Sequence, residues 1–133
     1  MGGETDLSRL LTGLTATLDK EVYVFVTLAD RPVPDGLTPR MRFEEGEGTT
    51  LILTRAEAEQ HAMAYEFPCR MITLNVHSAL EAVGFIARIA TLLAAHGMGV
   101  NPVAGFYHDH LFVPDGREDE ALSVLRDIAA GGG

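Results

Sequence analysis

One stretch of this sequence, Thr73–Pro114, narrows the possible folds more than any other. It begins with a strand pattern, in which apolar side chains occupy alternate positions up to Val76. An apolar segment with helical spacing follows and ends at Gly97, a residue suited to stopping a helix. Two short strand patterns then flank a turn at residues 107–109. The spacing therefore predicts a β-α-β-β unit.

The helix of this unit is predicted to begin at a capping box and to be unusually apolar. Residues 78–81, Ser-Ala-Leu-Glu, have the spacing of such a box, which places the helix from Leu80 to about His96. Its apolar positions form a stripe that is wider than one sheet can cover. The sequence therefore predicts that this helix covers a sheet and also meets a second helix or a second subunit. We expect a homodimer or higher homo-oligomer on this basis. The positions of the stripe are Val83, Phe85, Ile86, Ile89, Ala90, Leu92 and Leu93.

The rest of the chain predicts elements that match this unit in kind. Asp6 is placed to cap a first helix, whose leucines recur at helical spacing up to Leu18. Residues 29–39 contain three prolines and predict irregular structure. The remaining elements are a strand at Glu21–Leu28, a hairpin of Arg40–Glu45 and Thr49–Thr54, a helix that Thr54 and Glu57 cap and that runs to about Ala64, a strand at Arg70–Val76 after Pro68, and a helix at Glu118–Ala129.

The resulting order is α-β-loop-β-β-α-β-α-β-β-α, which predicts an α+β fold of two ferredoxin-like βαββαβ halves on antiparallel sheet. The first half, residues 1–68, is degenerate because the proline-rich loop replaces its crossover helix. The second half, residues 69–130, lacks its last strand. Residues 131–133 are three glycines and predict a disordered tail.

Composition limits the partners of the chain. Nineteen acidic residues against ten lysines and arginines give a net charge of −9, and the arginines are scattered, so nucleic acid is not an expected partner. Neither a signal sequence nor a membrane-spanning run is found, so we expect no membrane partner and a cytoplasmic location. The single cysteine, Cys69, excludes a disulfide within the chain and fits a reducing compartment.

Two corners of the β-α-β-β unit are candidates for binding a small molecule. In Gly97-Met98-Gly99-Val100-Asn101, the glycines allow backbone groups to approach a zwitterion, and Asn101 offers an amide. An ordinary helix end explains the same residues. Asn75, His77 and Ser78 lie where a strand meets a helix N-terminus, which favours an anion. The alternative is that Ser78 only caps the helix and that His77 is a structural residue.

The histidine-rich string at residues 107–110 permits other interpretations. His108 and His110 share a face if the chain is extended, which suits two metal ligands, with His77, Glu81 or a second chain as the third. Structural hydrogen bonds through the imidazoles are the alternative. Neither a nucleophile nor a second carboxylate is spaced with Asp109 for acid–base chemistry. We therefore expect no catalytic residue, no metal and no cofactor.

Two parts of the sequence resemble the ACT domain, namely Asn75–Phe85 and Leu93–Asn101. The strings VHSALEAVG at Val76–Gly84 and VAGFYHDHLFVP at Val103–Pro114 resemble those of small stand-alone bacterial proteins with tandem ACT-like halves. One difference is that Glu81 stands where ACT units typically have the aspartate of an Asp-x-x-Gly turn.

The resemblance implies a regulatory module that binds an amino acid and is not an enzyme. The residues implied in ligand binding are Asn75, His77, Ser78, Ala79, Leu80, Gly97, Met98, Gly99, Val100 and Asn101. The alternative is a protein–protein adaptor that keeps an ACT-like fold and has lost its ligand.

Overall fold

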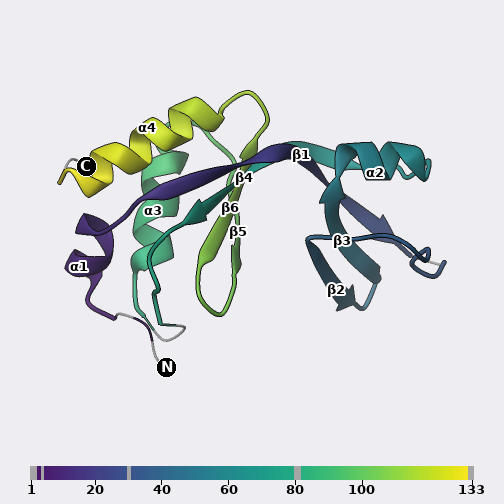
Figure 1. The fold of residues 1–133 in the computed structure, drawn as a ribbon, viewed down its shortest axis with the longest axis horizontal. Coiled ribbons are helices and arrows are strands. Elements are labelled where there is room, and N and C mark those ends of the chain that lie inside the picture. Colours follow the sequence, from purple (N-terminus) through teal and green to yellow (C-terminus); the bar gives the residue numbers. More distant parts are fainter. Residues whose placement is uncertain (1–2, 4, 30, 80–81, 132–133) are drawn as a thin grey trace. The chain divides into compact units, whose positions relative to one another are not determined.

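The computed structural model of the chain describes residue 3 and residues 5–29, 31–79 and 82–131. These residues contain four helices and six strands in the predicted order (Figure 1), so the α+β fold is confirmed. The elements are α1 (Leu7–Thr12), β1 (Ala16–Leu28), β2 (Met41–Glu45), β3 (Gly48–Thr54), α2 (Arg55–Gln60), β4 (Glu66–Leu74), α3 (Phe85–Ala94), β5 (Asn101–Ala104), β6 (Asp109–Pro114) and α4 (Glu118–Ala129).

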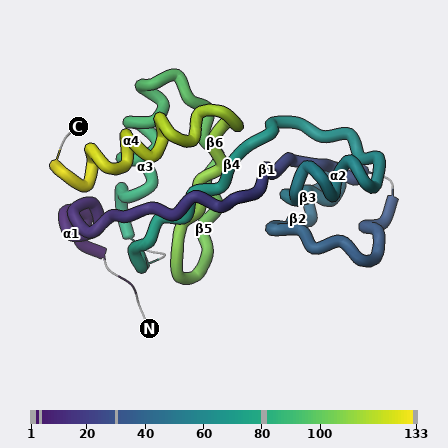
Figure 2. Tube along the Cα trace, turned by 45° about the horizontal axis from the view of Figure 1, so that its top comes forward, coloured from purple at the N-terminus to yellow at the C-terminus, as the bar shows by residue number. Residues whose placement is uncertain are grey.

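The chain forms two compact units that share two strands. Unit 1 contains residues 1–20 and 70–133 with the strand order β1-β4-β6-β5, and unit 2 contains residues 21–69 with the order β2-β3-β1-β4. Figure 2 traces β1 and β4, which are neighbours in the sheet, from one unit to the other. The first residues of β1 supply the last strand of the second half, and the first residues of β4 supply that of the first half. Each unit thereby has the four strands of a ferredoxin-like βαββαβ fold.

The predicted halves, 1–68 and 69–130, have different boundaries from these compact units, because residues 1–20 belong to the same unit as residues 70–133. The division of the sequence into halves stays a prediction. In the predicted tail, Gly131 is exposed and its N–H donates to the Ile128 carbonyl at 3.0 Å. Residues 132–133 lie outside the described residues.

Strand β1 begins earlier than the leucine spacing predicts. Helix α1 ends at Thr12 rather than continuing to Leu18, and β1 begins at Ala16 rather than at Glu21. The side chains after Gly13 alternate between apolar and polar, and the apolar ones pack on the core of unit 1 while the threonines between them are exposed. A period of two is typical of a strand. Asp6 does cap α1, since its carboxylate accepts from the Arg9 N–H at 3.1 Å.

Proline 68 lies inside a strand, which corrects the prediction that it separates two elements. Strand β4 starts at Glu66 rather than at Arg70, and it ends at Leu74 rather than at Val76. Phe67, just before the proline, has a φ of 56°. The strand is therefore irregular at this point, which is where a sheet tolerates proline.

Helix α3 begins later than the capping box predicts. Its N-cap is Gly84, with a φ of 90° and no hydrogen bond from a side chain, and its first residue is Phe85. A residue with a side chain is strained at this φ, whereas glycine adopts it readily. Ser78 does not cap a helix, and Leu80 and Glu81 lie outside the described residues. The helix ends at Ala94, followed by Gly97 with a φ of 71°, so the predicted stop at this glycine is confirmed.

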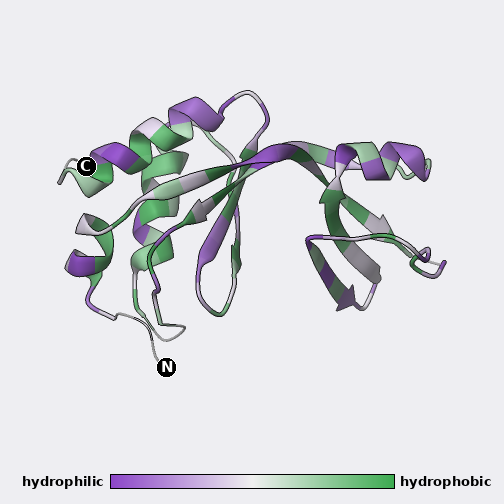
Figure 3. Ribbon diagram, viewed as in Figure 1, coloured by the Kyte–Doolittle hydropathy of each residue, from purple (hydrophilic) through white to green (hydrophobic). Residues whose placement is uncertain are grey.

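The wide apolar surface of α3 is used within unit 1. Ile89 and Leu93 are fully buried in a core that includes Leu10 of α1 and Leu125 of α4, together with residues of β4 and β6. Figure 3 shows the hydrophobic residues along α3 beside these elements. Most of the apolar arc that predicted a dimer is therefore buried or half-buried within unit 1, whereas Val83, just before the helix, is exposed. A homodimer stays a prediction without that support.

Unit 2 has its own core and confirms the predicted hairpin. Leu51 and Leu53 of β3 and Val24 of β1 are fully buried, and β3 pairs antiparallel with both β1 and β2. Thr54 accepts from the Glu57 N–H at 3.2 Å, as the capping box predicts, but α2 ends at Gln60 rather than near Ala64. Residues 29 and 31–39 form neither helix nor strand, as predicted.

Candidate functional site

A small pocket of about 210 Å³ lies where α3 begins, beside the hairpin of β5 and β6. We call it the entry pocket. It is smaller than the roughly 300 Å³ at the lower end of pockets for drug-sized molecules, so it suits a small ligand. Its lining residues are Ser78, Ala79, Ala82, Gly84, Phe85, Ile86, Ala87, Ala104, Gly105 and Asp109.

Asp109 gives the entry pocket a buried negative group. It is 8% exposed, and none of the ion pairs in the described part of the chain involves it. Its Oδ2 accepts a hydrogen bond from the Ser78 hydroxyl at 3.0 Å. Side chains alternate along a strand, so Asp109 at the start of β6 shares a face with Leu111 and Val113, which pack in the core with α3. The carboxylate therefore lies on the side of the sheet that carries the helices.

The first turn of α3 gives the same pocket a positive end. Phe85, Ile86 and Ala87 begin the helix and line the pocket. The first N–H groups of a helix have no partner within it, and no side chain of the described residues caps α3 at Gly84. Together with the helix dipole, these N–H groups favour an anion. The pocket thus presents an anion-binding end and a carboxylate, which complement the two charges of a zwitterion.

Only part of the predicted strand–helix corner lines this pocket. Ser78 and Ala79 do so, whereas Leu80 lies outside the described residues. The Asn75 side chain donates to the Thr17 hydroxyl at 2.7 Å, so it is held by β1. His77 is half-buried, and its ring centre lies 5.3 Å from that of Tyr107.

The second predicted group, Gly97–Asn101, lies beyond the other end of α3. A ten-residue helix is about 15 Å long, so the two predicted groups cannot contact one small ligand together. Met98 is buried in the core, and Asn101 is exposed in β5. The Arg117 guanidinium donates to the carbonyls of His96 at 2.8 Å and Gly97 at 3.2 Å. This segment therefore behaves as a helix end that α4 holds in place.

The same arginine sets the ionisation of a nearby carboxylate. Hydrogen bonds from Arg117 at 2.7 and 3.0 Å lower the pKa of Glu120 below its ordinary value, with smaller contributions from the Arg117 charge and from His96. Because the Glu120 pKa is lower in the folded than in the unfolded state, the ionised carboxylate stabilises the folded state at pH values above the unfolded pKa. This contribution is lost as the pH falls through the folded pKa. We expect Arg117→Ala to raise the Glu120 pKa toward its ordinary value, measured by NMR titration of the carboxyl carbon. Arg126→Ala on the same helix should leave it unchanged, and an unchanged pKa in Arg117→Ala would contradict the assignment.

The histidines of the hairpin bond to β4 and to the segment that follows it. Nδ1 of His108 lies 3.3 Å from the Val76 carbonyl oxygen, and Nδ1 of His110 lies 2.9 Å from the Thr73 hydroxyl. Among the described residues, no three His, Cys, Asp or Glu side chains are grouped as metal ligands would be. The structural alternative accounts for both histidines.

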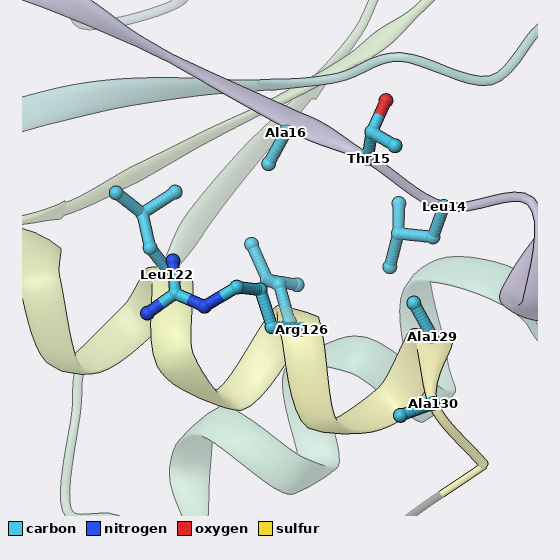
Figure 4. Close-up of a pocket in the computed structure, with 8 residues that line it drawn as sticks. Leu14, Thr15, Ala16, Leu122, Arg126, Ala129 and Ala130 are labelled. Atoms are coloured by element: carbon cyan, nitrogen blue, oxygen red, sulfur yellow. The ribbon is translucent and has the colours of Figure 1, made fainter.

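A larger cavity, of about 560 Å³, lies elsewhere in unit 1 (Figure 4). Leu14 and Ala16 point toward α4 across it, where Leu122 and Arg126 line the opposite side. Its lining is mostly aliphatic and includes none of the predicted site residues. We place the candidate site at the entry pocket because a buried carboxylate and a helix N-terminus converge there.

Sequence reasoning missed the residue that gives the pocket its charge. The two histidines drew attention to residues 107–110, and Asp109 between them was considered only for catalysis. The signal was present, because Leu111 and Val113 mark the core face of the strand and Asp109 precedes them by two residues. The residues at the start of α3 were missed because the capping box placed that start too early.

Two protein-family models match successive parts of the sequence. Models of the ACT domain match residues 2–70 and residues 66–127. None of the curated proteins matches the sequence. No helix in the described residues is both long and apolar enough to cross a membrane.

Solved structures share the fold over most of the chain. A Vibrio cholerae protein of unknown function, described as a possible transport protein, is 40% identical with a TM-score of 0.83, over 92% of this chain and 95% of that one. An Agrobacterium tumefaciens protein is 16% identical with a TM-score of 0.74, over 87% and 89%. The ligand-free regulatory subunit of aspartate kinase from Thermus thermophilus is 10% identical with a TM-score of 0.62, over 85% and 95%.

Proposed function

The chain belongs to the ACT-domain family, and we propose that it is a non-catalytic sensor that binds a small α-amino acid in the entry pocket. ACT domains are typically ligand-binding regulatory modules. The similar Thermus thermophilus protein is itself a regulatory subunit. The proposal adds to this family role the class of ligand and the position of its site.

One observation carries the proposal: the buried Asp109 carboxylate lies in the same small pocket as the open first turn of α3. The α-carboxylate of an amino acid would accept from the first N–H groups of the helix. Its α-ammonium would bind Asp109, which Ser78 holds in place by a hydrogen bond. A buried carboxylate without a cation is costly, so an ammonium ligand also relieves the free protein of that cost.

The test is the melting temperature of the purified protein with each of the twenty amino acids. A ligand that binds only the folded state at about 100 times its Kd stabilises it by about 2.7 kcal/mol, which raises the melting temperature measurably. We expect at least one amino acid to do so. The α-hydroxy acid with the same side chain should not, because it has no ammonium for Asp109. A flat response across the whole panel would refute the proposal and favour the adaptor alternative.

Substitution of Asp109 locates the site. We expect Asp109→Asn to weaken binding of the active amino acid by about tenfold or more, because a neutral amide cannot pair with the ammonium. Isothermal titration calorimetry measures the change. The control is Asp115→Asn, the same chemical change at an exposed turn, which should leave the affinity unchanged. Equal affinities in the two variants would place the ligand elsewhere.

A further inference from the structure

Large exposed hydrophobic side chains gather around the entry pocket. Among the described residues, the large hydrophobic side chains that are exposed are those of Phe43 at 62%, Val83 at 84%, Phe106 at 61% and Tyr107 at 62%. Val83 lies between the lining residues Ala82 and Gly84, and the two aromatic residues directly follow the lining residue Gly105. Three of the four therefore adjoin this one pocket, although isolated exposed apolar residues are ordinary elsewhere.

The aromatic members of this group contact one another. The ring centres of Phe106 and Tyr107 are 5.0 Å apart with an edge-on geometry, and the ring of His77 lies 5.3 Å from Tyr107 and 6.5 Å from Phe106. Such spacings are typical of favourable aromatic pairs. We call His77, Phe106 and Tyr107 the aromatic collar. His77 precedes the lining residue Ser78, so the collar adjoins the pocket through both the turn between β5 and β6 and the segment after β4.

The charge of the pocket lining restricts which amino acids can bind in the entry pocket. Among the described lining residues, Asp109 is the one ionisable side chain, and none is a lysine or an arginine. The carboxylate on the side chain of an acidic amino acid would have no cation there and would be repelled by Asp109. The second ammonium of a basic amino acid would have no second carboxylate among the described lining residues. The remaining lining residues are mostly alanine, glycine and larger apolar residues.

We propose that the ligand is an α-amino acid with an uncharged, apolar side chain of branched or aromatic type. This inference rests on the proposed function, because it assumes that the two charges of the ligand occupy Asp109 and the first turn of α3. The side chain then lies at the mouth of the pocket against Val83 and the aromatic collar. Binding removes these exposed apolar surfaces from water, which is what favours the apolar ligand over alanine.

Direct binding measurements on the full chain test the inference. The probes are L-leucine, L-phenylalanine, L-alanine, L-aspartate and L-lysine, each titrated by calorimetry. We expect leucine or phenylalanine to bind about tenfold tighter than alanine, since burying such a side chain is worth that much or more. Aspartate and lysine should bind more weakly than alanine. Aspartate or lysine binding as tightly as leucine would overturn the inference and leave the proposed function standing.

Variants separate the collar from the rest of the pocket. Phe106→Ser and Val83→Ser should each weaken binding of the preferred amino acid about fivefold or more and change alanine binding little. The matched control is Phe43→Ser, which alters an equally exposed phenylalanine in unit 2 and should have no effect. If Phe106→Ser instead converts an oligomer into a monomer by light scattering and keeps the affinity, the patch is a protein interface and the inference fails. If no amino acid binds the unaltered protein, the proposed function fails first.

Discussion

Replacing Ile89 by alanine should lower the free energy of unfolding by about 2–5 kcal/mol. Ile89 is 0% exposed and lies on the face of α3 that packs in the core of unit 1. The change removes buried apolar atoms and leaves a cavity that a packed core fills only partly. A domain typically has a free energy of unfolding of about 5–15 kcal/mol, so the substitution removes a large share of it. Urea unfolding followed by circular dichroism measures it, with the midpoint falling and the slope unchanged.

The control for this prediction lies just before the same helix. Val83 is 84% exposed, so Val83→Ala should change the free energy of unfolding by less than about 0.5 kcal/mol. A loss below about 1 kcal/mol in Ile89→Ala would mean that α3 does not pack as described. The covering of its apolar arc by α1 and α4 would then also be wrong.

Replacing Gly48 by alanine should lower the free energy of unfolding by about 2–3 kcal/mol. Gly48 begins β3 with a φ of 148°, a conformation in which a side chain is strained. An added Cβ would lie 2.7 Å from the Leu28 carbonyl oxygen and 2.8 Å from the Ala29 Cα. Both contacts are with backbone, so no side-chain rotation can relieve them. The loss should appear in urea unfolding and as lost amide protection in β2 and β3.

Gly46, two residues earlier in the same hairpin, provides the control. A Cβ at Gly46 would meet no atom within 4 Å, and its φ lies outside the range that disfavours side chains. Gly46→Ala should therefore change stability by less than about 0.5 kcal/mol, or raise it slightly by restricting the unfolded chain. Equal losses in the two variants would show that the hairpin tolerates no added methyl group, and that the crowding at Gly48 is not the cause.

The sequence predicted the order and type of the elements because strong local patterns determine them. Helix α4 has the predicted bounds, and the Thr54 capping box does begin a helix. Errors arose where two patterns fit the same residues. The leucines up to Leu18 suit a helical spacing, but threonines alternate with them after Gly13, and the strand pattern prevailed. Residues 78–81 satisfy a capping box, but the Ser78 hydroxyl donates to Asp109 at the start of β6 instead.

The candidate site was only half predictable for a related reason. Ser78 and Ala79 were found because a strand-to-helix junction is recognisable locally. Asp109 belongs to the site through the pairing of distant segments, and no local pattern reports that pairing. Gly97–Asn101 was predicted from its glycines, its amide and the family resemblance, although the length of α3 separates it from Ser78 and Ala79.

Two shared strands also constrain how this chain can fold as it is synthesised. Residues 16–20 leave the ribosome well before residues 70–133, which form most of the unit that they complete. Unit 1 therefore cannot close until α4 has emerged, whereas unit 2 is complete once residue 69 has. Pairing between segments so distant in sequence is slow to form. The leucines at positions 10, 14 and 18 must consequently stay exposed until α4 has been synthesised.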